Sequence, residues 1–203
     1  MGSIILASAS ARRQELLSQI GVQFTAESQD IDESIRSGEF ADDYVTRMAQ
    51  EKADSALSTL SDTQDSSDTL VLAADTSVVC DADVLGKPTD ESDAVAMLRR
   101  LSGREHRVLS AVTLATQSKQ RALLSESRVR FREIGIEEAQ QYYRSGEPEG
   151  KAGAYAIQGY AAVFIEQLIG SYSGVMGLPL FETAQLLAEF GVPVHPGNPA
   201  VVK

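Results

Sequence analysis

An apolar run at residues 69–80, with the sequence TLVLAADTSVVC, is interrupted near its centre by the carboxylate of Asp75. A buried strand tolerates a carboxylate only where the charge is paired, hydrogen-bonded or bound to a metal. The alternative is an aspartate at the end of a strand, facing water. The run therefore predicts a buried strand, a break at residues 75–76, a second strand and a turn at residues 81–83.

The rest of the chain alternates between helix-like and strand-like patterns. This mixture predicts an α/β fold built on a mixed sheet, and no linker is long enough to separate independent domains. The expected strands cover residues 3–8, 105–116, 121–132 and 161–168, and the expected helices cover residues 12–20, 40–60, 90–102, 136–145 and 180–190. A polar loop at residues 61–68 and a loose tail at about residues 192–203 complete the pattern.

Composition narrows the function classes. The 203 residues carry a formal net charge of -11, which argues against a broad face for nucleic acid. Cys80 is the single cysteine and His106 and His195 are the two histidines, which excludes an internal disulfide and a histidine-rich metal site. The chain shows neither a signal-peptide pattern nor an apolar run near the ~20 residues of a membrane helix. We therefore expect a cytoplasmic protein with no membrane or nucleic-acid partner.

The segment SASARR, residues 8–13, lies between an expected strand and an expected helix. Small residues let a ligand approach the backbone, and a helix N-terminus offers free N–H groups and a partial positive charge. Arg12 and Arg13 oppose the helix dipole at this end. Either an anion lies between the two arginines or they belong to an ordinary solvated turn, and the segment alone leaves both alternatives open.

Two further stretches place cations beside small residues. Lys87 follows the expected second strand, near Asp75, and the stretch GKAGAYAIQG at residues 150–159 carries Lys151 and Gln158. Glycine at this density permits close approach to the backbone, although a flexible loop is the alternative. Together with Asp75 and the acidic run at residues 30–33, these cations are the side chains expected to bind a polyphosphate and a divalent cation.

Six segments, in their order and spacing, resemble the Maf family of nucleoside triphosphate pyrophosphatases. They are LASASARRQELL, QEKA, AADTSVV, LGKP, EPEGKAGAYAIQG and GSYSGVMGLP, and the match extends to about residue 191. Arg13, Thr76 and Gln158 resemble the branch that acts on dTTP and UTP. The chain departs from the family at Ala11, where proline is usual, so the loop before the first helix is expected to be less rigid.

The resemblance implies a fold and a reaction. The fold would be a single inosine-triphosphate-pyrophosphatase-like domain over residues 1–203, with a curved mixed sheet flanked by helices and two lobes around a cleft. The reaction would use a divalent cation, Mg²⁺ or Mn²⁺, to cleave dTTP or UTP into the monophosphate and pyrophosphate. A house-cleaning role for nucleotide pools, a link to cell-division arrest and a homodimer are further expectations from the family.

The resemblance also assigns roles to residues. The expected catalytic residues are Asp75, Lys52 and Lys87, the expected metal ligands are Glu33 and Asp75, and the expected substrate-binding residues are Ser8, Arg12, Arg13, Thr76, Lys151 and Gln158. Asp75 is the expected base. Gln158 can both accept and donate hydrogen bonds and Arg13 only donates, so both suit the keto edges of uracil and thymine.

Two other function classes stay open at this point. A nucleotidyltransferase also begins with a strand, a small-residue loop and an arginine, although its loop usually contains glycines. A non-catalytic nucleotide-binding regulator of cell division would bind dTTP without turning it over. Release of pyrophosphate from dTTP without an acceptor would separate hydrolysis from nucleotide transfer.

Overall fold

A mixed sheet forms the centre of the computed structural model, which describes residues 3–60 and 69–196. Within these residues the sheet has seven strands in the order β2-β1-β3-β5-β6-β7, and β4 pairs with β3. Strand β1 runs parallel to β2 and β3, and the remaining pairings are antiparallel. The strands are β1 (Ile4–Leu6), β2 (Thr25–Ala26), β3 (Leu70–Cys80), β4 (Asp83–Leu85), β5 (Glu105–Ala115), β6 (Gln120–Phe131) and β7 (Ile165–Ile169).

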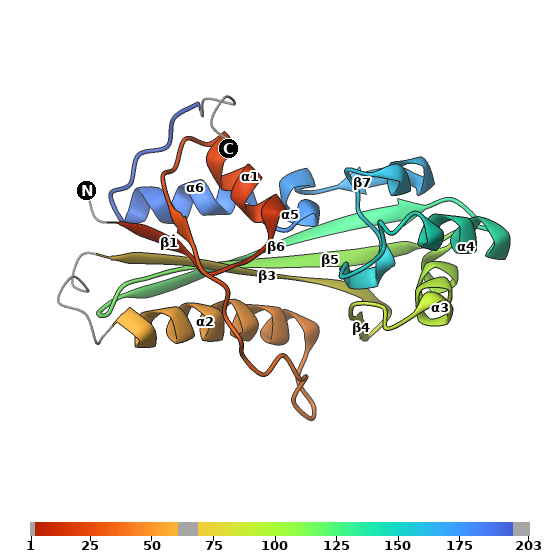
Figure 1. The fold of residues 1–203 in the computed structure, drawn as a ribbon, viewed down its shortest axis with the longest axis horizontal. Coiled ribbons are helices and arrows are strands. Elements are labelled where there is room, and N and C mark those ends of the chain that lie inside the picture. The colour runs from red at the N-terminus through yellow and green to blue at the C-terminus, as the bar shows by residue number, and fades with distance from the viewer. Residues whose placement is uncertain (1–2, 61–68, 197–203) are drawn as a thin grey trace.

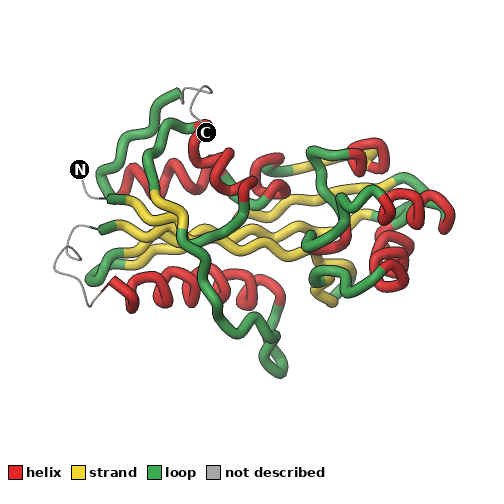
Figure 2. The backbone as a smooth tube through the Cα atoms, in the orientation of Figure 1, coloured by secondary structure: helices red, strands yellow, loops and turns green. Residues whose placement is uncertain are grey.

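Helices flank this sheet on both faces. Helix α2 lies along one face, α1 and α6 cover the other, and α3 and α4 gather near β4 at the end away from the N-terminus (Figure 1, Figure 2). The helices are α1 (Ala11–Gln19), α2 (Ala41–Leu60), α3 (Glu91–Leu101), α4 (Ile136–Arg144), α5 (Tyr172–Met176) and α6 (Leu180–Glu189), with the 3₁₀ helices η2 (Ala152–Ala154) and η3 (Tyr160–Phe164). The predicted α/β class and mixed sheet are confirmed.

Helix α2 shows how the local pattern positions a functional side chain. Its buried face includes the row Val45, Ala49, Ala53 and Leu57, which packs against β3, β5 and β1. Lys52 lies on the same face and is 8% exposed, so the helix carries a lysine into contact with the sheet. The predicted helix at residues 40–60 is confirmed.

The predicted break at residues 75–76 is wrong. Strand β3 continues through Asp75, which lies opposite Ala111 of β5, and the antiparallel register holds from Val71 to Val79. The strand continues because Lys52, from helix α2, hydrogen-bonds the Asp75 carboxylate and compensates its burial. A polar residue in an apolar run marked a paired charge here, and not the end of a strand.

The predicted strand at residues 161–168 is correct in its second half only. Residues 160–164 form η3 and the strand β7 begins at Ile165. The carboxylate of Glu147 accepts hydrogen bonds from the backbone N–H groups of Tyr160 and Ala161 and thereby holds the helical turn. Glu147 precedes Tyr160 by 13 residues in the sequence, so the local pattern does not indicate this contact.

The other predicted elements agree with the structure to within three residues at either end, whereas β2 and α5 were not predicted. The predicted polar loop at residues 61–68 and residues 197–203 of the predicted tail lie outside the described residues. Among the described helices, none is both long enough and apolar enough to cross a membrane.

Candidate active site

A cleft of about 530 Å³ opens beside the middle of β3. Segments far apart in the sequence line it, because the crossing of β1 beside β3 and the packing of α2 on the sheet bring them together. The lining segments are the turn from β1 to α1, the loop before α2, α2 itself, β3, the turn after β4, the glycine-rich stretch and α5.

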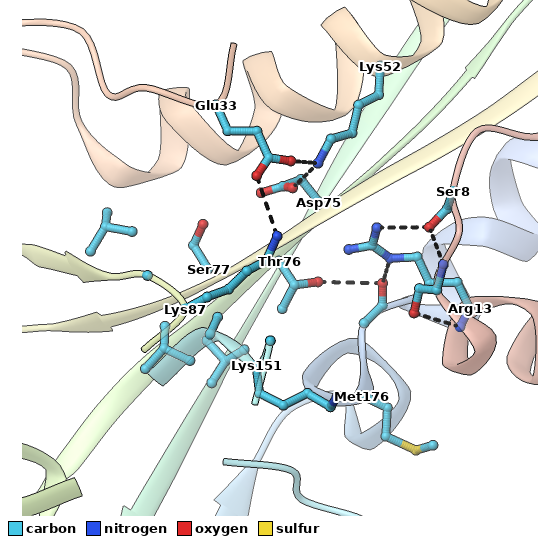
Figure 3. Close-up of a pocket in the computed structure, with 18 of the residues that line it drawn as sticks. Ser8, Arg13, Glu33, Lys52, Asp75, Thr76, Ser77, Lys87, Lys151 and Met176 are labelled. Atoms are coloured by element: carbon cyan, nitrogen blue, oxygen red, sulfur yellow. Dashed lines mark hydrogen bonds and ion pairs between the residues drawn. The ribbon is translucent and has the colours of Figure 1, made fainter. Parts of the chain in front are cut away.

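A chain of four charged side chains crosses this cleft (Figure 3). The Lys52 Nζ lies 2.7 Å from Asp75 Oδ1 and 2.7 Å from Glu33 Oε1. The second Glu33 oxygen, Oε2, lies 3.6 Å from Lys87 Nζ. Lys52 and Asp75 are almost fully buried, whereas Lys87 is exposed at the rim, so the chain of charges runs from the sheet out to solvent.

The ammonium groups keep the Glu33 carboxylate ionised. Partial burial acts to raise the pKa of Glu33, but the hydrogen bond and charge of Lys52, followed by those of Lys87, outweigh it and hold the pKa below its usual value. Burial and the negative charges of Asp75 and Glu33 raise the pKa of Tyr44 to about 12. The Tyr44 hydroxyl therefore stays protonated and donates to the backbone oxygen of Glu33 at 2.9 Å.

Arg13 lies across the cleft from Glu33. Its Nε donates to the backbone oxygen of Gly177 at 2.8 Å and its Nη1 donates to Ser8 Oγ at 3.3 Å. Burial lowers the pKa of the Arg13 guanidinium, while the charges of Asp75 and Glu33 act in the opposite direction. Thr76 completes this side, with Oγ1 3.4 Å from the Gly177 oxygen and 2.9 Å from Ser110 Oγ.

The cleft brings most of the predicted residues together. Its lining includes Ser8, Arg13, Glu33, Lys52, Asp75, Thr76, Lys87 and Lys151. Among the described residues, Arg12 and Gln158 are outside this lining. Arg12 is exposed and pairs with Glu15, at 2.5 Å, on its own helix. The substrate contacts of Arg12 and Gln158 therefore stay predictions.

A family model described as Maf-like protein matches residues 3–190. The chain belongs to the Maf family. The dTTP/UTP pyrophosphatase of Hahella chejuensis is 51% identical to this Maf protein over 191 residues, which cover 94% of each chain. The dTTP/UTP pyrophosphatase of Cupriavidus metallidurans is 52% identical over 199 residues, covering 95% of this chain and 99% of the relative. That of Bordetella parapertussis is 50% identical over 195 residues, covering 94% of each chain.

The acidic side chains of this Maf protein suit a divalent cation that arrives with a phosphate ligand. No group of three or more His, Cys, Asp or Glu side chains is placed to hold a metal within residues 3–60 and 69–196. Glu33 and Asp75 nevertheless direct one oxygen each to the same point, the Lys52 Nζ. Mg²⁺ usually takes one or two protein carboxylates and completes its octahedron with waters and substrate phosphates. Two carboxylates fit that requirement.

Sequence reasoning missed several residues of the cleft. Tyr44 and Gly177 were not assigned, although both contact residues that were. A signal existed for Tyr44, because it precedes Lys52 by eight positions, about two helical turns, and so shares its side of α2. Gly177 lies in the segment GSYSGVMGLP, which contributed to the family resemblance without an assigned role.

The glycine-rich stretch of this Maf protein is ordered against β3. Gly153 has φ +67°, and a Cβ added there would lie 2.9 Å from Val78 Cγ1. Its N–H donates to the backbone oxygen of Gly86 at 3.0 Å. The stretch therefore forms a wall of the cleft, and glycine is needed at residue 153 for both its backbone angle and its close contact.

The Gly153→Ala variant is expected to unfold more easily than the Gly150→Ala variant. Both glycines have φ +67°, but a Cβ at residue 150 meets no atom within 4 Å. The shared backbone strain costs about 1–3 kcal/mol, and the contact with Val78 adds to it at residue 153 alone. Urea unfolding followed by circular dichroism measures both losses. Equal losses in the two variants would show that the contact with Val78 is unimportant.

Proposed function

We propose that this Maf protein hydrolyses dTTP and UTP to the nucleoside monophosphate and pyrophosphate. The carrying observation is the position of Lys52 between Glu33 and Asp75 in a cleft whose other wall holds Arg13. In such an arrangement a buried cation can bind phosphate oxygens, and a carboxylate beside it can accept the proton of an attacking water. The relatives at about 50% identity, all named dTTP/UTP pyrophosphatases, support the choice of substrate.

Asp75 is the base in the proposed reaction. A water oxygen attacks the α-phosphorus, the bond from that phosphorus to the oxygen bridging the α- and β-phosphates breaks, and the bridging oxygen leaves on pyrophosphate. Asp75 takes the proton of the water, which later passes to solvent. The Lys52 hydrogen bond orients the Asp75 carboxylate. Glu33 and Asp75 would hold Mg²⁺ or Mn²⁺, and such a cation supplies positive charge against the phosphate oxygens.

The lysines of the cleft stabilise the charge that moves to the leaving group. Lys52 is held by two carboxylates before substrate binds, so little reorganisation is needed. Lys87 is 64% exposed on its side chain and has the freedom to leave Glu33 for a phosphate oxygen. Lys151 lines the cleft and lies near the rim, where its Nζ donates to the backbone oxygen of Glu149. Each of these ammonium groups can donate a charge-assisted hydrogen bond to a phosphate oxygen.

We also propose that the mixed sheet belongs to an inosine-triphosphate-pyrophosphatase-like single domain, in which the curved sheet carries two lobes around the cleft. The support is the separation of the apolar core into one cluster around α3 and α4 and others around α1, α2 and α6. A homodimer stays a prediction, which light scattering in solution would test.

A panel of nucleotides tests the proposed substrate choice. With Mg²⁺ or Mn²⁺ present, dTTP and UTP are expected to yield pyrophosphate and monophosphate, and CTP to react roughly 5- to 150-fold more slowly. The physical reason is that Arg13 only donates hydrogen bonds, and a mispaired buried donor costs about 1–3 kcal/mol. Equal kcat/KM values for dTTP, UTP and CTP would contradict the proposal. Tight binding of dTTP without turnover would favour a non-catalytic nucleotide-binding protein.

A further inference from the structure

We propose that Arg47 is a positioning residue, which holds Glu33 in the cleft by binding the loop at residues 27–40 to helix α2. The inference rests on the proposed function, in which Glu33 takes part in the reaction. Arg47 itself is outside the lining of the cleft in the described structure, so it would act through the loop and not on the substrate.

The Arg47 guanidinium contacts the loop at three points. Its Nε donates to Glu39 Oε1 at 2.6 Å and its Nη2 donates to Glu39 Oε2 at 2.6 Å, which is a two-pronged carboxylate contact. Nη2 also donates to the backbone oxygen of Ser34 at 3.0 Å, directly after Glu33. The Arg47 and Glu39 side chains are 13% and 9% exposed, so the contact is shielded from solvent.

The loop depends on such contacts because residues 27–40 contain no helix or strand. Tyr44 holds the loop one turn earlier on α2, through the backbone oxygen of Glu33. Arg47 also pairs with Glu51, at 3.3 Å, and Glu51 in turn pairs with Arg36 of the loop at 2.8 Å. The first three turns of α2 thus hold the loop at Glu33 itself and at three positions that follow it, namely 34, 36 and 39.

The contact between Arg47 and Glu39 joins two groups that both stay charged. The hydrogen bonds from Arg47 outweigh burial and hold the pKa of Glu39 at about 2. The pair therefore stays ionised at neutral pH and well below it. Without Arg47, the backbone of the loop can move away from α2, and the separation of Glu33 Oε1 from Lys52 Nζ, now 2.7 Å, is no longer fixed. A displacement of about 1 Å in a catalytic group can cost about 10²-fold in rate.

The test compares Arg47→Met with Arg132→Met, a matched control. Arg132 also binds one carboxylate with two prongs, Glu138 at 2.6 and 2.9 Å, and donates to two backbone oxygens at 2.9 and 2.8 Å. It is outside the cleft lining of the described structure. Arg47→Met is expected to lower kcat for dTTP by about 10- to 100-fold, and Arg132→Met by less than about 3-fold. Arg47→Lys, which keeps the charge but not the fork, is expected to lie between wild type and Arg47→Met.

A double-mutant cycle with Glu33→Gln separates positioning from general damage. If Arg47 acts through Glu33, Glu33→Gln/Arg47→Met turns over dTTP as slowly as Glu33→Gln alone. A double variant slowed by the product of the two single losses would overturn the inference, as would wild-type kcat in Arg47→Met. Should Arg47→Met fail to fold, the same cycle with Arg47→Lys decides. Full activity of Glu33→Gln would instead remove Glu33 from the reaction, so the two failures are distinguishable.

Discussion

The Asp75→Asn variant is expected to fold and to bind dTTP, but to turn it over about 10²- to 10⁴-fold more slowly than wild type. That range is the usual contribution of a positioned general base. Asparagine has nearly the same shape and can still accept a hydrogen bond from Lys52, now at 2.7 Å from Asp75 Oδ1, but it cannot take a proton from water. The loss should therefore appear in kcat far more than in KM.

Asp83→Asn provides the matched control. Asp83 is an aspartate on the neighbouring strand β4, but it pairs with Arg100 at 2.6 Å and is outside the lining of the cleft in the described residues. Its variant should keep wild-type kcat. Circular dichroism would establish folding for both variants, and calorimetric titration with dTTP would establish binding for Asp75→Asn. An Asp75→Asn protein with near-wild-type turnover would refute the proposed role of Asp75.

The Lys52→Met variant is expected to lose both activity and stability. Removing one partner of a buried ion pair typically costs about 3–5 kcal/mol, because the remaining charge is left uncompensated. Here two carboxylates, Glu33 and Asp75, would face each other without the ammonium that now lies 2.7 Å from each. Loss of a preorganised cation that stabilises transition-state charge lowers kcat by about 10²- to 10³-fold.

A second substitution tests the cause of this instability. Lys52→Met/Asp75→Asn removes the uncompensated charge at Asp75, and Glu33 keeps Lys87 at 3.6 Å. The double variant should therefore regain part of the free energy of unfolding lost in Lys52→Met while staying inactive. Lys119→Met, at a surface lysine packed over the Phe190 ring, is the control and should change the free energy of unfolding by about 1 kcal/mol or less. Urea unfolding measures all three. A Lys52→Met protein as stable as the Lys119 variant would contradict the proposed compensation.

Local pattern was sufficient for most of the secondary structure. The apolar rows of α2 predict its buried face, and Gly21 and Gly103, both at positive φ, lie just after the ends of α1 and α3, where glycine is typical. These features depend on contacts within a few residues. The course of β3 through Asp75 could not be predicted in the same way, because the compensating Lys52 is 23 residues away in the sequence.

The candidate site was predicted more through resemblance than through pattern. Charge and small residues indicated a phosphate site near Asp75 and Lys87, and the structure brings these residues to one cleft. The adjacent arginines show the limit of pattern, because they look equivalent in the sequence. In the structure Arg13 turns into the cleft and Arg12 pairs with Glu15 on the helix surface. Helical geometry separates neighbouring side chains by about 100°, so one face cannot present both.

The central claim is that water attacks the α-phosphorus of dTTP and releases pyrophosphate. Hydrolysis of dTTP in ¹⁸O-labelled water tests this claim most directly. With Mg²⁺ present, phosphorus NMR should show dTMP and pyrophosphate in equal amounts, with the ¹⁸O label in dTMP, because water attacks the α-phosphorus beside Asp75. The Asp75→Asn protein should form both products far more slowly. Label in pyrophosphate, release of inorganic phosphate with thymidine diphosphate, or no turnover by the wild-type protein would contradict it.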